Sequence, residues 1–402
     1  MNEIKFNSMI VEDISSGYPL LNKYLMDNGV FQKSRYGDTF ELIDFRLEII
    51  NPMKRVVGCN MRDSNIFFLL AEALWIWLGR NDVEFLTIFN SKMFEFSDDG
   101  KSFHAPYGFR LRNYGYCRPE DIDFDADMSL DQIHKAIKIF KNNNDDRRVV
   151  LSIWDSFLDL DVISKDIPCN DMVMLKIRDN KLRTTIANRS NDIAWGLGTN
   201  IFQFSFITEL MSLCIPGVSL GTQTHNIQSL HYYTNNLITK RLVDNYVEVG
   251  NNSLYKYVNP TPFDFNFNPY GENVNRLTIL DDEIKNVVES LLKLYKNEIN
   301  LQEYLRRITH LTTISKKLYE IANILAYFVI RKISGMVKEE YTETIIINLL
   351  EEFELDDYLL MAINWLYNRI SDEGIKQRVD LFLKQFAIFP ADTNLRNIIG
   401  SF

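Results

Sequence analysis

The chain has few cysteines, and they lie far apart. In 402 residues only Cys59, Cys117, Cys169 and Cys214 occur, and no two of them form a CxxC pair. A disulfide framework or a structural zinc site needs paired or clustered thiols. The spacing therefore argues against both, predicts no metal site, and favours a reducing cytoplasm as the compartment.

Long apolar runs and an excess of positive charge are also lacking. No stretch of about 18 uncharged apolar residues occurs, and the first residues show no signal-peptide pattern, so we expect neither a membrane span nor secretion. The formal net charge is −10. An acidic balance makes a nucleic-acid binder with a broad basic surface unlikely, although it permits a local basic pocket.

The first two thirds of the chain alternate between strand and helix patterns. Hydrophobic residues make up 46% of the sequence and aromatic residues 13%, which is enough for a large core. This alternation predicts an α+β fold with a mixed sheet. The expected elements are strands at 39–50 and 147–155, a hairpin at 174–190 turning at Asp179-Asn180, and buried helices at 64–79 and 200–215.

The last third reads almost wholly as helix. A connector rich in Pro and Asn, 258–275, separates it from the alternating part. The segments 281–297 and 356–370 carry amphipathic stripes, and each begins with two aspartates that suit a helix cap. We therefore expect a catalytic or binding domain over 1–275 and a helical C-terminal extension over 276–402.

Cys169, in "IPCN", is the cysteine with the most suggestive neighbours. Arg147 and Arg148 precede it by about twenty residues and Arg189 follows at a similar interval. Nearby cations favour a thiolate nucleophile, and arginine binds phosphate through two parallel hydrogen bonds. The residues alone leave two simpler alternatives open: a buried apolar cysteine, and a strand end whose arginines form surface ion pairs.

Several motifs, in order, resemble the thymidylate synthase family. "RSNDIAWGLGTN" (189–200) is similar to that family's Arg-Ser-x-Asp signature with its following Gly-Leu and Asn. The other matches, in chain order, are "RYGD" (35–38), "EALWIWLG" (72–79), "APYGFRLR" (105–112), "DDRRVV" (145–150), "IPCN" (167–170) and "SLHYY" (229–233). The resemblance implies a thymidylate-synthase-like mixed sheet with packed helices, and it does not reach the helical extension.

The resemblance also implies a reaction. The family joins a one-carbon unit from 5,10-methylene-tetrahydrofolate to carbon 5 of a pyrimidine nucleotide monophosphate, here expected to be dUMP, after a cysteine thiolate adds to carbon 6. Cys169 would be that nucleophile, in a homodimer whose Arg147 and Arg148 reach across the interface. The residues expected to bind the nucleotide phosphate and sugar are Arg35, Arg147, Arg148, Arg189, Ser190, His231 and Tyr233.

The same resemblance assigns the base and the folate. Asn200 would pair with uracil, whose O4 accepts and N3 donates, as an amide can match. Tyr107 would lie near the nucleophile, and Glu72 would move protons through water. The residues expected at the folate are Asp192, Trp195 and Gly196. Taken alone, Asn200 could equally be a helix N-cap, and Glu72 is a carboxylate on an apolar helix that needs a partner.

The chain departs from the family pattern in ways that bear on the product. Asn170 follows the cysteine where the family usually has His, and Met93, Phe94 and Phe96 stand where a Trp is typical. About 169 residues continue beyond Tyr233. Hydride transfer in a dry site gives thymidylate, whereas water attack gives hydroxymethyl-dUMP. Thymidylate synthesis is placed first and hydroxymethylation second; a non-catalytic nucleotide binder and a docking protein remain further alternatives.

Overall fold

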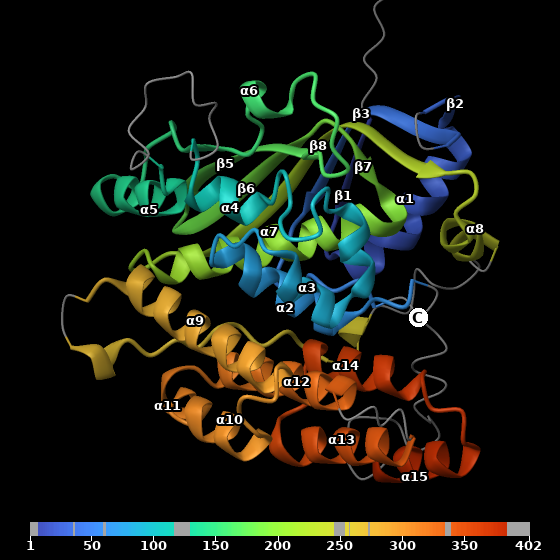
Figure 1. The fold of residues 1–402 in the computed structure, drawn as a ribbon. Coiled ribbons are helices and arrows are strands. Elements are labelled where there is room, and N and C mark those ends of the chain that lie inside the picture. Colours follow the sequence, from blue (N-terminus) through green and yellow to red (C-terminus); the bar gives the residue numbers. More distant parts are fainter. Residues whose placement is uncertain are drawn as a thin grey trace, which may run out of the picture.

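The computed structural model describes residues 7–34, 37–58, 62–115, 129–244, 254–256, 258–271, 274–333 and 339–383. A mixed β-sheet forms one layer, helices cover one of its faces, and a second helical layer packs on those helices (Figure 1). This architecture confirms the predicted α+β class with a helical C-terminal region. No helix in these ranges is both long and apolar enough to cross a lipid bilayer.

The sheet mixes parallel and antiparallel neighbours. Its strands pair in the order β1-β3-β8-β6-β5-β4, with β2 added to β3 and β7 to β8, and the β1–β3, β6–β8 and β7–β8 pairs are parallel. The strands are β1 Ser8–Val11, β2 Val30–Gln32, β3 Thr39–Ile49, β4 Val150–Ser152, β5 Asn170–Arg178, β6 Lys181–Asn188, β7 Asn191–Asp192 and β8 Ser219–Tyr233.

The strand expected at 147–155 is shorter than predicted. Only Val150–Ser152 pairs regularly with β5. The backbone N–H groups of Ile153 and Trp154 both donate to the carbonyl of Asp171, at 2.9 Å each, so the regular ladder ends there. The residues of 147–155 favour a strand, but the length of the strand is limited by its pairing with β5.

The β5–β6 hairpin has the predicted turn. Asp179 and Asn180 adopt φ angles of 54° and 56°, the left-handed region that Asp and Asn tolerate best. Beyond the open end of the hairpin, the backbone N–H of Arg189 donates to the carbonyl of Cys169 at 3.1 Å. The register of the hairpin therefore brings the thiol of Cys169 close to the guanidinium of Arg189, although the two residues are twenty positions apart.

Two helices at the centre of the molecule match the predicted buried segments. The helices of this part are α1 Ile14–Asn28, α2 Ile66–Trp77, α3 Val83–Phe89, η1 Ser91–Phe96, α4 Tyr107–Arg112, α5 Gln132–Asn142, α6 Ser156–Asp159, η2 Ile193–Leu197, α7 Gly198–Leu213, α8 Leu237–Asp244 and η4 Leu254–Lys256. Helix α2 ends before Gly79, whose φ of 63° suits glycine and where a Cβ would lie 2.6 Å from the Cβ of Arg112.

The extension is helical, as predicted, but one predicted cap is wrong. The connector contains η5 Asn268–Tyr270, and the elements of the extension are α9 Arg276–Tyr295, α10 Leu301–Ile308, α11 Leu311–Ile314, α12 Lys316–Ile333, α13 Glu339–Glu352, α14 Asp357–Tyr367 and α15 Glu373–Leu383. Asp356 caps α14 by accepting from Tyr358 N, as expected. Helix α9 begins at Arg276, so Asp281 lies inside it and binds Arg112 at 2.6 Å instead.

The extension shares one hydrophobic core with the central helices. Phe328 of α12 packs on Phe67 of α2, with ring centroids 4.8 Å apart, and Trp365 of α14 lies edge-on to Phe67 at 5.3 Å. Near them a buried ion pair joins Arg55 to Glu209 at 2.5 Å. Because apolar rings from both parts fill the same core, each part would expose apolar surface to water if the other were absent.

We predict that Phe328→Ala lowers the free energy of unfolding by about 3–5 kcal/mol, because truncating a buried aromatic leaves a cavity. Urea unfolding would measure the change. Leu381→Ala is the control: Leu381 is 65% exposed, so its removal should change stability by no more than about 0.5 kcal/mol. Equal effects of the two changes would contradict a shared core.

Candidate active site

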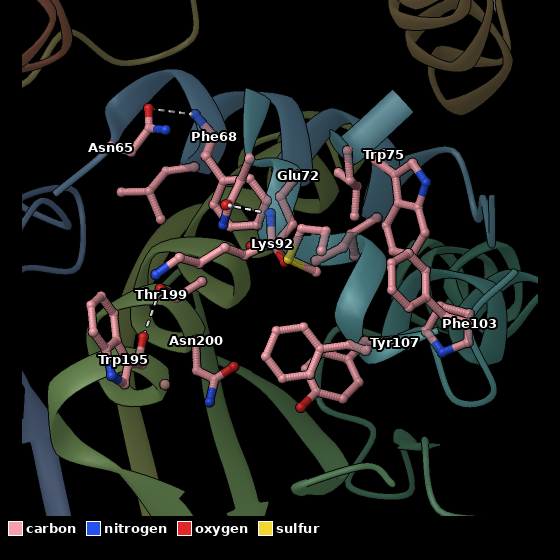
Figure 2. A pocket seen from close by; sticks show the side chains of 18 of the residues that line it. Asn65, Phe68, Glu72, Trp75, Lys92, Phe103, Tyr107, Trp195, Thr199 and Asn200 are labelled. Carbon is pink, nitrogen blue, oxygen red and sulfur yellow. Dashed lines mark hydrogen bonds between the residues drawn. The ribbon is translucent and has the colours of Figure 1, made fainter. Parts of the chain in front are cut away.

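A cavity of about 610 Å³ opens between α2, η1, the start of α4 and the start of α7 (Figure 2). Its apolar wall includes Phe68, Trp75, Met93, Phe96 and Phe103. Of the residues predicted for a site, Glu72, Tyr107, Trp195, Gly196 and Asn200 line it. The structure thus brings together predicted residues from three separate segments of the sequence.

Glu72 enters this cavity from the apolar helix α2. Gln203 of α7 donates from Nε2 to Glu72 Oε2 at 2.7 Å, which gives the carboxyl the partner that burial demands. Burial raises the pKa of Glu72 to about 7, and the bond from Gln203 opposes that rise. A carboxyl that titrates near neutrality can both accept and release a proton.

Cys169 lies immediately before β5, with its thiol beside a guanidinium. Arg189 Nη2 is 3.8 Å from Cys169 Sγ, and the same guanidinium donates to the carbonyls of Pro168 and Ile167 at 2.8 and 3.3 Å. Burial raises the pKa of the Cys169 thiol, while the charge of Arg189 opposes the rise. These contacts fix the arginine against the cysteine loop, so the positive charge cannot move away from the sulfur.

Tyr107 connects the cysteine to the cavity. It is the first residue of α4, its ring stacks on Phe204 at 6.2 Å, and its hydroxyl is close to the backbone of Cys169 and the side chain of Asn170. Burial raises the pKa of Tyr107 far above its ordinary value. The hydroxyl therefore stays protonated and can donate a hydrogen bond.

Asn200 belongs to a buried chain of neutral polar side chains. Asn170 Nδ2 donates to Asn200 Oδ1 at 3.1 Å, and Asn200 Nδ2 donates to Asn191 Oδ1 at 3.2 Å. Upstream, His225 Nδ1 lies 3.2 Å from Asn188 Oδ1, and burial lowers the pKa of His225 to about 3, so the imidazole is neutral. From donor to acceptor the order is Gln223, His225, Asn188, Asn170, Asn200, Asn191.

The turn that carries Trp195 and Gly196 is held from two sides. Asp192 accepts from the backbone N–H groups of Ala194 and Trp195, at 3.1 and 3.2 Å. Arg62 donates to the carbonyls of the same two residues, at 3.1 and 3.0 Å. A Cβ on Gly196 would lie 2.9 Å from Asn191 Oδ1, so this position favours glycine. The cavity wall is thereby fixed by hydrogen bonds.

The other predicted residues lie outside this cavity. His231 is buried on β8 opposite Asp192, with Tyr233 edge-on to it at 5.3 Å, and Ser190 is half-buried beside Arg189. Arg147 and Arg148 are exposed, and Arg148 binds Asp146 at 2.7 Å. Arg35 lies outside the described residues.

Sequence reasoning did not find Arg62, Gln203 and His225. Gln203 follows Asn200 by three residues on a helix, so their shared face was a usable signal. No sequence signal marked Arg62 or His225. The role of Arg62 depends on carbonyls that are distant in the sequence, and that of His225 depends on the register of the sheet. Within the described ranges, no group of three or more His, Cys, Asp or Glu side chains could hold a metal ion.

We predict that Glu72→Gln flattens the pH dependence of stability between about pH 4.5 and 7. The folded pKa of Glu72 lies above its unfolded value, so the stability linked to its proton is full at acid pH and is lost as the pH rises through about 7. Glutamine keeps the shape and the acceptor for Gln203 but does not titrate. Urea unfolding at several pH values would test this, with exposed Glu84→Gln as control; parallel curves for Glu72→Gln and the unaltered protein would refute it.

Comparison with known proteins agrees with this geometry. A family model described as thymidylate synthase matches residues 17–307, which is most of the chain. The match includes α9 and nearly all of α10, so the expectation that the resemblance does not reach the helical extension was wrong. The chain is similar to the deoxyuridylate hydroxymethyltransferase of Pseudomonas phage M6, with 38% identity over 208 residues, 51% of this chain and 55% of that protein. The protein of the same name from Bacillus phage SP01 is 38% identical over 195 residues, 48% of this chain and 50% of that protein.

A more distant similarity covers more of the chain. The bifunctional dihydrofolate reductase-thymidylate synthase of Plasmodium berghei is 26% identical over 283 residues, 69% of this chain and 44% of that protein. The chain spans about half the length of the curated relatives it matches. Since the family model covers both the cysteine hairpin and the cavity, the chain belongs to the thymidylate synthase family.

Proposed function

We propose that this protein transfers a one-carbon unit from 5,10-methylene-tetrahydrofolate to carbon 5 of dUMP. The contact that carries the proposal is the 3.8 Å approach of Arg189 to the Cys169 thiol, beside a cavity lined by Glu72, Tyr107 and Asn200. Family membership supports the chemistry, and the names of the phage relatives support deoxyuridylate as substrate.

In this proposal Cys169 adds to carbon 6 of the uracil ring, which makes carbon 5 nucleophilic. Arg189 holds the nucleotide phosphate together with Ser190 and Arg35, while His231 and Tyr233 bind the sugar. A nucleotide held by its phosphate cannot drift away from the thiol, so positioning supplies much of the rate.

Asn200 reads the base. Its Oδ1 and Nδ2 each make one hydrogen bond within the amide chain, which leaves a second acceptor lone pair and a second N–H for the uracil N3 and O4. The chain fixes which end of the amide presents the donor. The amide can therefore match the N3–H donor and the O4 acceptor of uracil.

The folate lies in the cavity in this proposal. Trp195 and Gly196 form one wall, and Asp192 supports the turn that carries them and binds the pterin. The aromatic wall at Phe68, Trp75 and Phe103 suits a flat ring, and Glu72 moves protons through water at the base.

Hydroxymethyl-dUMP is the product we favour over dTMP. The sequence analysis placed thymidylate first, but the two phage relatives named deoxyuridylate hydroxymethyltransferase share 38% identity with the chain, against 26% for the named thymidylate synthase. The cavity also presents polar groups at its rim, among them Asn90, Lys92 and Thr199. Thymidylate synthesis remains the second candidate, supported by the family model.

We also propose a homodimer formed through the uncovered face of the sheet. On that face Ile43 and Val150 are 52% and 48% exposed, and Met172 is 37% exposed, which is unusual for apolar strand residues. Arg147 and Arg148 lie next to β4 on the same sheet, so a second copy could receive them at its phosphate site.

We retain the proposal of a catalytic domain over 1–275 and an extension over 276–402. We also retain a reducing cytoplasm as the compartment, which suits the free thiols of Cys169 and Cys214.

The first experiment incubates the protein with dUMP and methylene-tetrahydrofolate and determines the mass of the nucleotide. A hydroxymethyl group with tetrahydrofolate released supports the favoured product, and a methyl group with dihydrofolate released supports thymidylate synthesis. Cys169→Ala should abolish turnover with the thermal midpoint unchanged. Full turnover by Cys169→Ala would refute the mechanism, and no product from the unaltered protein would favour a non-catalytic nucleotide binder.

Mixing subunits tests the dimer. Cys169→Ala protein and Arg147→Ala/Arg148→Ala protein should each be inactive, because one lacks the nucleophile and the other the phosphate ligands. After unfolding and refolding together, about half the dimers are hybrids with one intact site of two, so roughly a quarter of the normal activity should return. No recovery would place the arginines in their own subunit's site, and an arginine double variant that is active before mixing would place them outside any site.

A further inference from the structure

The helical extension touches the rim of the cavity through Arg369, which follows α14. Its guanidinium forms two parallel bonds to Asp63, Nη1 to Oδ1 at 3.2 Å and Nη2 to Oδ2 at 2.8 Å. The same group lies 3.4 Å from the ring centre of Trp365 and donates to the carbonyl of that residue at 2.9 Å. Stacking on Trp365 and three hydrogen bonds hold the guanidinium of Arg369 in one orientation.

Asp63 continues directly to the cavity wall. It lines the cavity itself, and its φ of 48° is a left-handed conformation that costs a non-glycine residue energy unless its contacts hold it. Its neighbour Arg62 is buried and donates to the carbonyls of Ala194 and Trp195. Two sets of hydrogen bonds, joined by the peptide bond between Arg62 and Asp63, thus lead from Arg369 to the turn that carries Trp195.

A second contact holds another part of the rim. Lys332 near the end of α12 donates from Nζ to the carbonyls of Thr87 and Ile88, at 2.8 and 2.6 Å. These are among the last carbonyls of α3, which lack partners within the helix and attract a cation. The next residues, Asn90 and the start of η1, line the cavity.

We propose that the extension positions the two rims of the folate cavity, with Arg369 and Lys332 as its positioning residues. The ligand in this statement rests on the proposed function, whereas the coupling between extension and rim does not. Asp63 is 49% exposed and Arg369 30%, so the pair is worth up to about 1 kcal/mol, or roughly a fivefold effect on binding.

Hydrogen exchange tests the coupling without any ligand. Arg369→Gln removes the two parallel bonds to Asp63, so the backbone amides of 193–199 should exchange faster. Lys332→Gln removes the bonds to the carbonyls of Thr87 and Ile88, so the backbone amides of 90–96 should exchange faster. Arg378→Gln is the matched control, because Arg378 also forms a two-bond pair with a carboxylate, that of Glu343 at 2.7 Å for each bond, inside the extension. Unchanged exchange at both rims, with the thermal midpoint kept, would overturn the proposal.

Kinetics tests the consequence. Arg369→Gln should raise the KM for methylene-tetrahydrofolate about two- to fivefold and the KM for dUMP by less, because Trp195 and Gly196 lie in the loosened turn whereas Arg189, which would hold the phosphate, lies outside the cavity. Asp63→Asn should match it, and the double variant should be no worse than either single variant. A general loss of kcat with both KM values unchanged would indicate a merely structural contact. If the unaltered protein shows no turnover, the proposed function fails, and the exchange experiment still decides the coupling.

Discussion

The rest of the structure depends on covering helix α2, which is apolar on nearly every side. One side packs on α7 and another on α12 and α14 of the extension, where Phe67 lies against Phe328 and Trp365. A helix of this composition is stable only when buried on all sides. Because α2 also carries Glu72, the packing that satisfies its apolar residues places one carboxyl at the cavity.

Register supplies the second constraint. The pairing of Asn170 with Asn188 sets Cys169 beside Arg189, and the parallel pairing of β6 with β8 sets His225 within reach of Asn188. A shift by one residue would turn each of these side chains to the other face of the sheet. The approach of Cys169 to Arg189 therefore depends on strand register, whereas the cavity itself is lined by helices and connecting segments.

Much of this could be predicted from the sequence, for identifiable reasons. The hairpin followed from Asp179-Asn180, and helix α2 from its apolar run ending at Gly79. Five of the residues lining the cavity, Glu72, Tyr107, Trp195, Gly196 and Asn200, followed from ordered motifs. The ion pair of Asp63 with Arg369 could not be predicted, because its partners are 306 positions apart and no local pattern marks either. The wrong helix cap predicted at Asp281 shows the same limit. The local sequence rule for helix N-caps fitted Asp281, but in the structure this residue forms an ion pair with Arg112, which is distant in the sequence.

The amide chain through Asn200 has a consequence for how this protein can change over evolution. Every member donates to the next in one direction, and Gln223 fixes that direction at one end because its Nε2 also donates to the carbonyl of Ile201 at 3.2 Å. Reversing the donor and acceptor ends of Asn200 would set donor against donor, or acceptor against acceptor, at Asn170 and Asn191. A descendant that reads a different base would therefore have to change several of these residues together, so the positions should covary as a group rather than drift one at a time.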